Sequence, residues 1–361
     1  MTANAIPPGS TIGILGGGQL GRMLAMAAAR LGLKSHIYAP EADSPAFDVA
    51  VAHTIAAYDD ESALKRFASG VAVATYEFEN IPVATVDFLS KLIPVRPGAK
   101  ALACAQDRIN EKTLARELGA GTAPFAKVDS RDDLATALAT IGVPAVLKTR
   151  RFGYDGKGQA KILKPDGATA AWDEMRGAPS ILEGFVSFER EVSVIAARGV
   201  DGDFCAFDVT ENEHRNHILH RSIAPARIAT ADRNAAIDIA HKIADRLDYV
   251  GVFAIEFFAL ADGALLVNEM APRVHNSGHW TMDGAETSQF EQHIRAVAGW
   301  PVGSTKMTAP GAEMINLIGD DILAWQSIAA EPGAILHHYG KKDARPGRKM
   351  GHVNRRLAKA P

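Results

Sequence analysis

Residues 250–271 read VGVFAIEFFALADGALLVNEMA, and this stretch decides the fold of the central part of the chain. Two apolar runs flank Asp262-Gly263, a dipeptide that is a strong signal for a two-residue hairpin loop. If these two residues form the loop, Ala261 faces Ala264, and counting outward along both strands places Glu256 directly opposite Glu269. We therefore predict an antiparallel hairpin that carries both carboxylates on one face, with their Cβ atoms about 5 Å apart.

Two facing carboxylates inside apolar strands need a compensating charge. Like charges in such a position destabilise a fold unless one group is protonated or a cation lies between them. Paired carboxylate oxygens suit Mg²⁺, which also takes oxygens from phosphate groups. The alternative is that this side of the hairpin is exposed to solvent and that the carboxylate pair has no function. Because both residues stand within strongly apolar runs, we favour a metal site formed by Glu256 and Glu269.

The N-terminal segment predicts a second, parallel unit. Residues 11–15 (TIGIL) form a strand-like run, a glycine cluster and apolar residues at helical spacing follow, and residues 35–38 (SHIY) read as another strand. Such a β-α-β opening predicts a parallel sheet. The glycines at 16–21 match G-x-G-x-x-G, whose N–H groups can bind phosphate at a helix start. Three interpretations stay open from this motif: a dinucleotide site with Glu41 on a ribose, another phosphate site, or close packing alone.

Lys148 and the glycine-rich segment after it predict a phosphate-binding lid. Lys148 ends the apolar part of the run 145–149 (AVLKT), and 153–159 (GYDGKGQ) follows with three glycines. A cation followed by a loop whose backbone can approach phosphate is what a triphosphate lid requires. The alternatives are a lysine that merely reaches solvent and a plain hairpin turn.

The segment after the lid predicts a nucleotide hinge. In ILEGFV, Glu183 and the backbone after it could serve a purine edge, while Phe185 and Val186 supply apolar walls. Glu191, eight residues after Glu183, could accept from ribose hydroxyls. Taken singly, each glutamate is more often a solvent-facing residue.

Composition limits the class of protein and its compartment. The chain has 361 residues, of which 47% are hydrophobic and 22% charged, which suits roughly two to three globular domains. Its net charge of −3 argues against a general nucleic-acid binder, although the segment after His337 is basic. Two cysteines predict buried free thiols. We see neither a secretory signal nor a bilayer-spanning run, so we expect a cytoplasmic protein with no nucleic-acid or membrane partner.

From about residue 100 the pattern becomes mixed. Helical periods at 107–118, 131–141 and 232–247 alternate with strand-like runs at 180–182, 191–197 and 205–209, which together predict an α+β region.

The order of these features resembles the ATP-grasp superfamily: lysine, glycine lid, Glu-x-x-Val hinge, second glutamate, then two opposed glutamates. Longer strings narrow the resemblance to N(5)-carboxyaminoimidazole ribonucleotide synthetases, the ATPase subunits of a purine-pathway carboxylase. These strings are TYEFENI (75–81), QDR (106–108), TAPF (122–125), GYDGKGQ (153–159), NEMAPRVHNSGHWT (268–281), SQFEQHIRA (288–296) and YGK…RPGRKMGH (339–352).

The resemblance implies an α/β and α+β fold in three parts. A Rossmann-like parallel sheet that holds substrate would span residues 1–100. A central ATP-grasp domain would span 101–300, with a lid subdomain at about 125–190, and a small C-terminal β-rich domain would span 301–361.

The resemblance also implies an ATP site with Mg²⁺ on Glu256 and Glu269. Asn268 adjoins this pair, although strand alternation predicts that its side chain points the other way, and His214 matches the family less cleanly. The implied ATP-binding residues are Arg108, Lys148, Gly153, Tyr154, Asp155, Gly156, Lys157, Gly158, Gln159, Glu183, Gly184, Phe185, Val186, Glu191, His214, Asn268 and Glu269.

In that family, ATP and bicarbonate carboxylate aminoimidazole ribonucleotide through carboxyphosphate, giving ADP and phosphate in purine biosynthesis, and the enzyme is a homodimer. The implied substrate-binding residues are Gln19, Leu20, Glu77, Tyr154, Asp155, Arg273, His275, Asn276, Lys341, Arg348 and Lys349. Arg273, Asn276, Asp155 and Lys148 would be catalytic, and either Asp155 or a phosphate oxygen would take the proton of the amine. Three alternatives remain: an ATP-grasp ligase with another acyl donor or acceptor, with less support an NAD(P)-dependent oxidoreductase, and a non-catalytic sensor that binds ATP without turnover.

Overall fold

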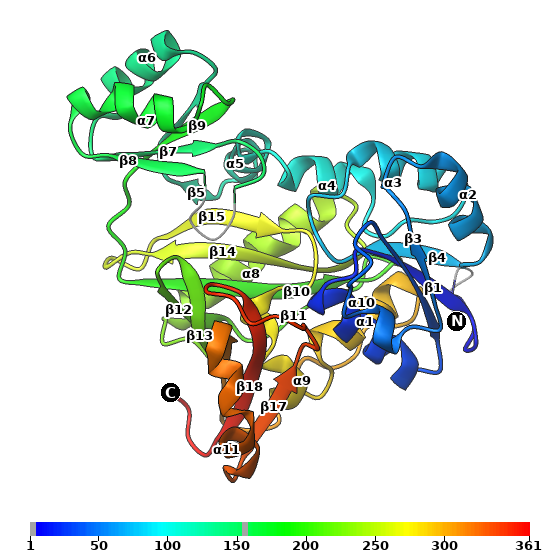
Figure 1. Cartoon of the computed structure of the whole chain (residues 1–361). Coiled ribbons are helices and arrows are strands. Elements are labelled where there is room, and N and C mark those ends of the chain that lie inside the picture. Colours follow the sequence, from blue (N-terminus) through cyan, green and yellow to red (C-terminus); the bar gives the residue numbers. More distant parts are fainter. Residues whose placement is uncertain (1–4, 154–157) are drawn as a thin grey trace.

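The structure, a computed structural model, describes residues 5–153 and 158–361, and it arranges their strands in three sheets (Figure 1). Four predicted site residues, Tyr154, Asp155, Gly156 and Lys157, lie outside the described residues. Within the described ranges, no helix is both long and apolar enough to cross a membrane.

The N-terminal sheet is parallel and has the strand order β3-β2-β1-β4. Its elements are β1 (Thr11–Leu15), α1 (Gln19–Arg30), β2 (Lys34–Ala39), η1 (Phe47–Val49), β3 (Ala52–Ile55), α2 (Glu61–Ser69), β4 (Val73–Tyr76) and α3 (Val83–Ser90). Strand β1 is central and almost wholly buried, which explains its unbroken apolar sequence. The predicted β-α-β opening is confirmed. The edge strand β3 escaped prediction because it is largely exposed and carries no apolar run.

The central sheet has ten strands in the order β17-β18-β16-β13-β12-β10-β14-β15-β5, with β11 paired to β10. Its strands are β5 (Gly121–Thr122), β10 (Arg190–Arg198), β11 (Phe204–Ala206), β12 (Thr210–Arg215), β13 (Ile218–Ala224), β14 (Gly251–Ala259), β15 (Leu265–Ala271), β16 (Gly311–Ile318), β17 (Ala334–His338) and β18 (Lys349–Leu357). The C-terminal strands β16–β18 join this sheet through the antiparallel pair of β13 and β16. The last segment of the chain is therefore built onto the central one by backbone hydrogen bonds.

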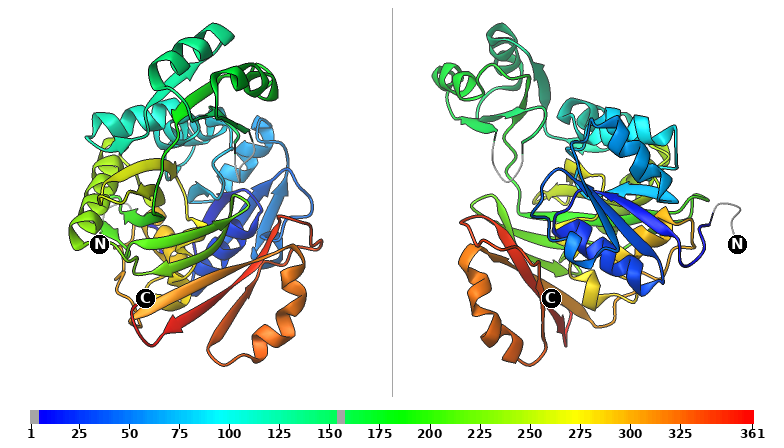
Figure 2. Two further views of the ribbon diagram at one scale, coloured as in Figure 1. Left: turned by 90° about the vertical axis from the view of Figure 1, so that its left-hand side faces the viewer. Right: turned by 45° about the vertical axis from the view of Figure 1, so that its right-hand side comes forward.

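Helices cover the central sheet and connect it to the N-terminal sheet (Figure 2). They are α4 (Ala99–Ala105), α5 (Arg108–Glu117), α8 (Thr230–Arg246), η3 (Asn276–Gly278), α9 (Thr281–Gly284), α10 (Gln289–Val297), η4 (Gly319–Ala324) and α11 (Trp325–Ala330). The predicted helices at 107–118 and 232–247 correspond to α5 and α8.

The third sheet lies in the segment that was predicted to form the lid, and it projects away from the other two sheets (Figure 1). Its strands are antiparallel in the order β6-β9-β7-β8, and its elements are β6 (Phe125–Val128), α6 (Arg131–Ile141), β7 (Ala145–Thr149), β8 (Gln159–Ile162), η2 (Pro165–Gly167), α7 (Ala168–Glu174) and β9 (Ser180–Gly184). Leu147, Trp172 and Leu182 belong to a small hydrophobic core whose described members all lie between residues 126 and 182.

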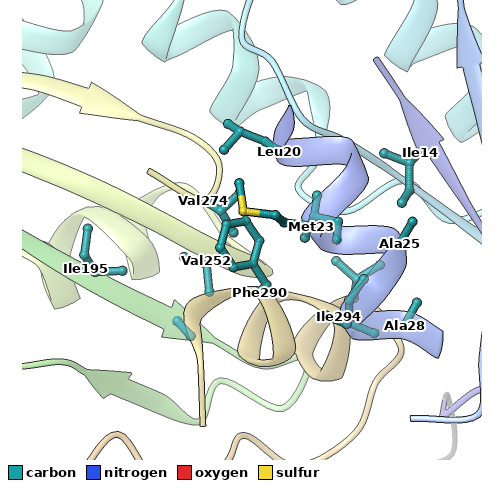
Figure 3. Packing of buried hydrophobic residues seen from close by; sticks show 14 of the residues in the cluster. Ile14, Leu20, Met23, Ala25, Ala28, Ile195, Val252, Val274, Phe290 and Ile294 are labelled. Atoms are coloured by element: carbon teal, nitrogen blue, oxygen red, sulfur yellow. The ribbon is translucent and has the colours of Figure 1, made fainter. Parts of the chain in front are cut away.

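A shared hydrophobic core holds the N-terminal and central sheets together. Met23 on α1 lies against Phe290 on α10, and Val252 on β14 closes the same cluster from the side of the central sheet (Figure 3). All three side chains are 5% exposed or less, and burying each contributes about 1.5–3 kcal/mol. This packing places the N-terminal glycine loop beside the central sheet.

Candidate active site

The β14–β15 hairpin places Glu256 directly opposite Glu269, as predicted. The route to this register differs from the prediction at two points. The loop has three residues, because Leu260 N–H donates to Ala264 O and Gly263 turns with φ +86°. This one-residue offset is cancelled by a bulge between Phe257 and Glu256, where Asn268 is the extra residue on β15. Two deviations of opposite sign therefore restore the predicted carboxylate pair.

The bulge also changes where Asn268 lies. Strand alternation predicted that its side chain points away from the carboxylates, but Asn268 lines the same cleft as Glu256 and Glu269, so that prediction was wrong. Its Oδ1 atom is buried and has no hydrogen-bond partner. Burial, reinforced by the charge of Glu269, raises the pKa of Glu256 to about 8. Two carboxylates and an unpaired amide oxygen are the kind of oxygen ligands that divalent cations such as Mg²⁺ bind. The described residues contain no group of three or more His, Cys, Asp or Glu side chains that could hold a metal ion.

Lys148 on β7 reaches Glu183 on the neighbouring strand β9. Lys148 Nζ donates to Glu183 Oε2 over 2.8 Å, and Lys112 Nζ lies 3.5 Å from Glu183 Oε1. Burial alone would raise the pKa of Glu183, but the two lysines lower it to about 2. Lys112 is 1% exposed and also donates to Val267 O, so it connects strand β9 to the β14–β15 hairpin. Sequence patterns missed Lys112, because a lysine on a helix normally reads as a surface residue.

Arg108 stands between the lid and the carboxylate pair. Its guanidinium lies 3.2 Å from Glu269 Oε2 and 3.4 Å from the carbonyl oxygen of Gly153. Glu111, one turn further along α5, is buried and accepts the N–H of Met270. Burial and the charge of Glu269 raise the pKa of Glu111 to about 8. Glu111 was also missed, since nothing in a helical sequence marks it as facing another carboxylate.

The predicted nucleotide hinge lies in the cleft. Glu183, Gly184, Phe185 and Val186 line it, and so does the stacked pair of Phe188 and Phe258, whose ring centroids are 4.6 Å apart. No sequence pattern predicts this aromatic pair. Each ring comes from a different segment, so only the folded sheet brings them together.

Glu191 and His214 also come together in the cleft. His214 Nδ1 hydrogen-bonds Glu191 Oε2, and although burial alone would lower the pKa of His214, this partner raises it. Gly158 accepts the N–H of Thr149, and Gln159 pairs with Lys148 in the β7–β8 ladder.

The glycine loop surrounds the carboxylate of Glu77. Gly18 N–H donates to Glu77 Oε1 over 2.6 Å, and Gly21 N–H donates to Oε2 over 2.9 Å. A Cβ atom on Gly16 or Gly18 would lie only 2.5–2.6 Å from this side chain, so close packing requires both glycines. Glu77 thus takes two of the N–H groups that a dinucleotide pyrophosphate would use, which weakens the oxidoreductase alternative.

Three further residues of the 268–281 string, Arg273, His275 and Asn276, line the same cleft. Arg273 Nε donates to Glu79 Oε2, and Asn276 exchanges two amide hydrogen bonds of 2.8 and 3.0 Å with Asn316. His275 Nε2 lies 3.6 Å from Glu256 Oε1. Burial and the charges of Arg273 and Lys349 lower the pKa of His275 well below its ordinary value.

A basic cluster faces the glycine loop from the C-terminal segment. Lys341 Nζ donates to the carbonyl oxygen of Lys349, and Lys341, Arg348 and Lys349 line the cleft together with Gln19 and Leu20. Burial, followed by the charge of Arg348, lowers the pKa of Lys341 to about 8.

One cleft of ≈ 1150 Å³ joins all these groups. Every described residue of the predicted site lines it, apart from Gly158. These residues are Gln19, Leu20, Glu77, Arg108, Lys148, Gly153, Gln159, Glu183, Gly184, Phe185, Val186, Glu191, His214, Glu256, Asn268, Glu269, Arg273, His275, Asn276, Lys341, Arg348 and Lys349.

Family models match three successive parts of the chain. The ribonucleotide synthetase preATP-grasp domain matches residues 10–106, the ATP-grasp domain matches 113–290, and the phosphoribosylaminoimidazole carboxylase C-terminal domain matches 312–359.

Individual relatives agree over nearly the full length. N5-carboxyaminoimidazole ribonucleotide synthase of Brucella melitensis is 52% identical over 357 residues, which cover 98% of each chain. The ADP complex of an N5-carboxyaminoimidazole ribonucleotide synthetase superposes with a TM-score of 0.95 at 43% identity, covering 99% of this chain and 95% of the other. The Aspergillus clavatus enzyme in complex with ADP and 5-aminoimidazole ribonucleotide gives a TM-score of 0.90 at 28% identity, covering 98% and 95%. The chain therefore belongs to the N5-carboxyaminoimidazole ribonucleotide synthase family.

Proposed function

We propose that this chain uses ATP and bicarbonate to carboxylate the amine of aminoimidazole ribonucleotide, giving N5-carboxyaminoimidazole ribonucleotide, ADP and phosphate. The observation that carries the proposal is the single cleft that joins a carboxylate pair and Lys148 to a basic cluster beside the glycine loop. An ATP-grasp ligase that acts on a phosphorylated second substrate needs both parts in one enclosure. The family membership of the chain supports the same reaction.

In the ATP half of the cleft, Glu256 and Glu269 would hold Mg²⁺, next to the unpaired Oδ1 of Asn268. When bound, the ion would neutralise charge on the phosphates of ATP. Lys148 and Arg108 would contact those phosphates, and the hinge of Glu183 to Val186 would frame the adenine. Glu191 and His214, already hydrogen-bonded to each other, would hold the ribose.

In the other half, Lys341, Arg348 and Lys349 would bind the phosphate of the ribonucleotide. The N–H groups of Gln19 and Leu20, at the start of α1, add the positive end of a helix. Glu77 fixes this loop through Gly18 and Gly21 and presents its carboxylate to the same space.

The reaction would proceed in two steps between these halves. A bicarbonate oxygen attacks the γ-phosphoryl group of ATP, which gives carboxyphosphate and ADP, and the protein supplies positioning and positive charge. The amine of the ribonucleotide then attacks the carboxyl carbon and phosphate leaves, or carboxyphosphate first loses phosphate and the amine attacks the released CO₂; the proton of the amine would pass to Asp155 or to a phosphate oxygen. Arg273, His275 and Asn276 line the same cleft and would hold the reacting carbon and amine about 3–3.5 Å apart. Exclusion of water by the lid protects carboxyphosphate until transfer.

We further propose the domain limits 1–100, 101–300 and 301–361, and a homodimer as the assembly. Light scattering of the purified chain measures the mass directly, and a monomeric mass would reject the dimer.

The decisive test of the reaction is release of ADP with all combinations of aminoimidazole ribonucleotide and bicarbonate. We expect full turnover only when both are present, together with formation of the carboxylated ribonucleotide. If another acyl donor replaces bicarbonate, the chain is a different ATP-grasp ligase. If ATP is never hydrolysed, the proposed function is wrong.

A further inference from the structure

A line of buried hydrogen bonds crosses the central sheet and ends on His275. Ser222 Oγ donates to Asn212 Oδ1 over 2.8 Å, and Asn212 Nδ2 donates to Ser193 Oγ over 3.0 Å. Ser193 Oγ donates to Ser277 Oγ over 2.8 Å, and Ser277 Oγ lies 2.9 Å from His275 Nδ1. The three serines are fully buried and Asn212 is 6% exposed, so each group depends on its neighbour in the line.

The line lies next to the proposed metal pair. Asn212 and Ser222 face each other across β12 and β13, and Ser193 faces Glu256 across β10 and β14. Ser277 lies in η3, two residues after His275, and its hydroxyl connects the line of hydrogen bonds to the His275 ring. His275 Nδ1 therefore faces the line, whereas Nε2 faces Glu256 at 3.6 Å.

The backbone determines the direction of the line. The N–H of Ser277 donates to His275 Nδ1 over 3.4 Å, and a backbone N–H can only donate. Nδ1 is therefore an acceptor without a proton, and the hydroxyl of Ser277 donates to it as well. Ser277 Oγ must then accept from Ser193, which accepts from Asn212, in agreement with every other contact. If the line ran the other way, a proton on Nδ1 would point at the N–H of Ser277.

We propose that Ser277, Ser193, Asn212 and Ser222 are positioning residues that hold His275 as the Nε2–H tautomer, so that His275 acts as a hydrogen-bond donor and not as a base. A neutral imidazole whose Nδ1 accepts must carry its proton on Nε2. That N–H points to the Glu256 side of the cleft, where it can donate to an anionic oxygen of the carboxyl group being transferred. It cannot also take the proton of the attacking amine. The catalytic part of this inference rests on the proposed function, whereas the tautomer does not.

The tautomer can be measured on the chain without substrates. Long-range ¹H–¹⁵N correlation of ¹⁵N-histidine-labelled protein distinguishes protonated from unprotonated ring nitrogens, and His275→Gln identifies the signal of His275. We expect an unprotonated Nδ1 and a protonated Nε2. His293 is an internal reference, because its Nδ1 accepts the N–H of Val252 over 3.0 Å while its Nε2 meets Thr75 Oγ1. A protonated Nδ1 on His275 would overturn the proposal, whatever the activity of the chain.

Two variants test the positioning line. Ser277→Ala should move the ¹⁵N signals of His275, leave those of His293 in place, and lower kcat by about 10- to 100-fold, as loss of a group that orients a functional histidine does. Thr75→Val is the matched control, because it removes a buried hydroxyl from a histidine outside the cleft. It should move the His293 signals and leave kcat almost unchanged. If Ser277→Ala alters neither the His275 signals nor kcat, the line has no positioning role.

Substitutions of His275 separate a donor from a base. The amide N–H₂ of Gln reaches about as far as Nε2, whereas that of Asn stops near Nδ1. A donor role predicts that His275→Asn loses about 100- to 1,000-fold in kcat while His275→Gln keeps most of the wild-type rate. A base role predicts equal losses, because neither amide can accept the proton. Equal losses would therefore reject the donor role and leave the tautomer result standing.

Discussion

Replacing Glu256 with glutamine should stabilise the empty protein and abolish its response to magnesium. Burial and the charge of Glu269 raise the pKa of Glu256 from 4.5 to about 8. The folded chain therefore holds this proton more tightly than the unfolded chain does. As the pH rises from 4.5 toward 8, the wild-type protein loses stability, whereas Glu256→Gln has no charge to release at this position.

The size of the effect follows from this window. A change of two pH units between the two pKa values corresponds to at most about 3 kcal/mol. Relaxation of the surroundings reduces this to roughly 1–2 kcal/mol. The free energy of unfolding of Glu256→Gln minus that of wild type should therefore rise by this amount when the pH is raised from 5.5 to 7.5.

The assay is urea unfolding at both pH values, with and without Mg²⁺ and ADP. Glu189→Gln is the control, because Glu189 has a side chain that is 56% exposed and should behave like wild type. Mg²⁺ with ADP should stabilise wild type more than ADP alone, and should not do so for Glu256→Gln. The reasoning fails if the variant is not relatively more stable at the higher pH, or if magnesium stabilises it as much as wild type.

Three further predictions concern the two halves of the cleft. Glu269→Gln should abolish ADP release by removing the second carboxylate of the metal pair, and near-normal activity at low Mg²⁺ would contradict this role. The double substitution Arg348→Ala and Lys349→Ala should raise the KM for aminoimidazole ribonucleotide by at least about tenfold with little change for ATP, since each lost phosphate contact costs about 1.5–3 kcal/mol; equal changes in both KM values would speak against a phosphate clamp. Burial lowers the pKa of Lys341 to about 8, so its charge is present below that pH and lost above it. The KM for the ribonucleotide should therefore rise between pH 7.5 and 9, and Lys341→Arg should remove this rise; a pH-independent KM ratio between the two proteins would be inconsistent with a charged Lys341 in binding.

Long apolar or glycine-marked segments could be predicted from the sequence, and polar strands could not. The apolar run AVLKT at 145–149 coincides with β7, and α6 begins and ends where the helical period at 131–141 predicted it. The sequence of β12, TENEHR, shows no alternation of apolar and polar residues. Its buried residues are Thr210 and Asn212, which are polar and pair with other polar groups. The short apolar run at 93–95 (IPV) forms no strand and provides only an isolated bridge at Val95.

The candidate site shows the same division. The described residues that the motifs singled out line one cleft, apart from Gly158, but patterns could not supply the contacts between them. The register of Glu256 and Glu269 was predicted from a two-residue loop, and the structure reaches it through a longer loop and a bulge at Asn268. The burial of Lys112 and Glu111 could not be predicted, because it depends on tertiary packing against β15 and β9. Local sequence periodicity carries no information about such packing.

The continuous central sheet also sets the separation of the two reactants. Five strand spacings lie between β14 and β18, through β10, β12, β13 and β16, so a flat sheet would hold Glu256 and Lys349 about 24 Å apart. Lys349 is nevertheless close enough to influence the pKa of Glu256, and β14 runs across Figure 1 while β18 runs down it. Strong coiling of the sheet therefore brings strands β14 and β18 closer together than a flat sheet would allow. A substitution that flattens this curvature should move the proposed ATP site away from the proposed ribonucleotide site. It should therefore slow the reaction even if every residue of both sites is unchanged.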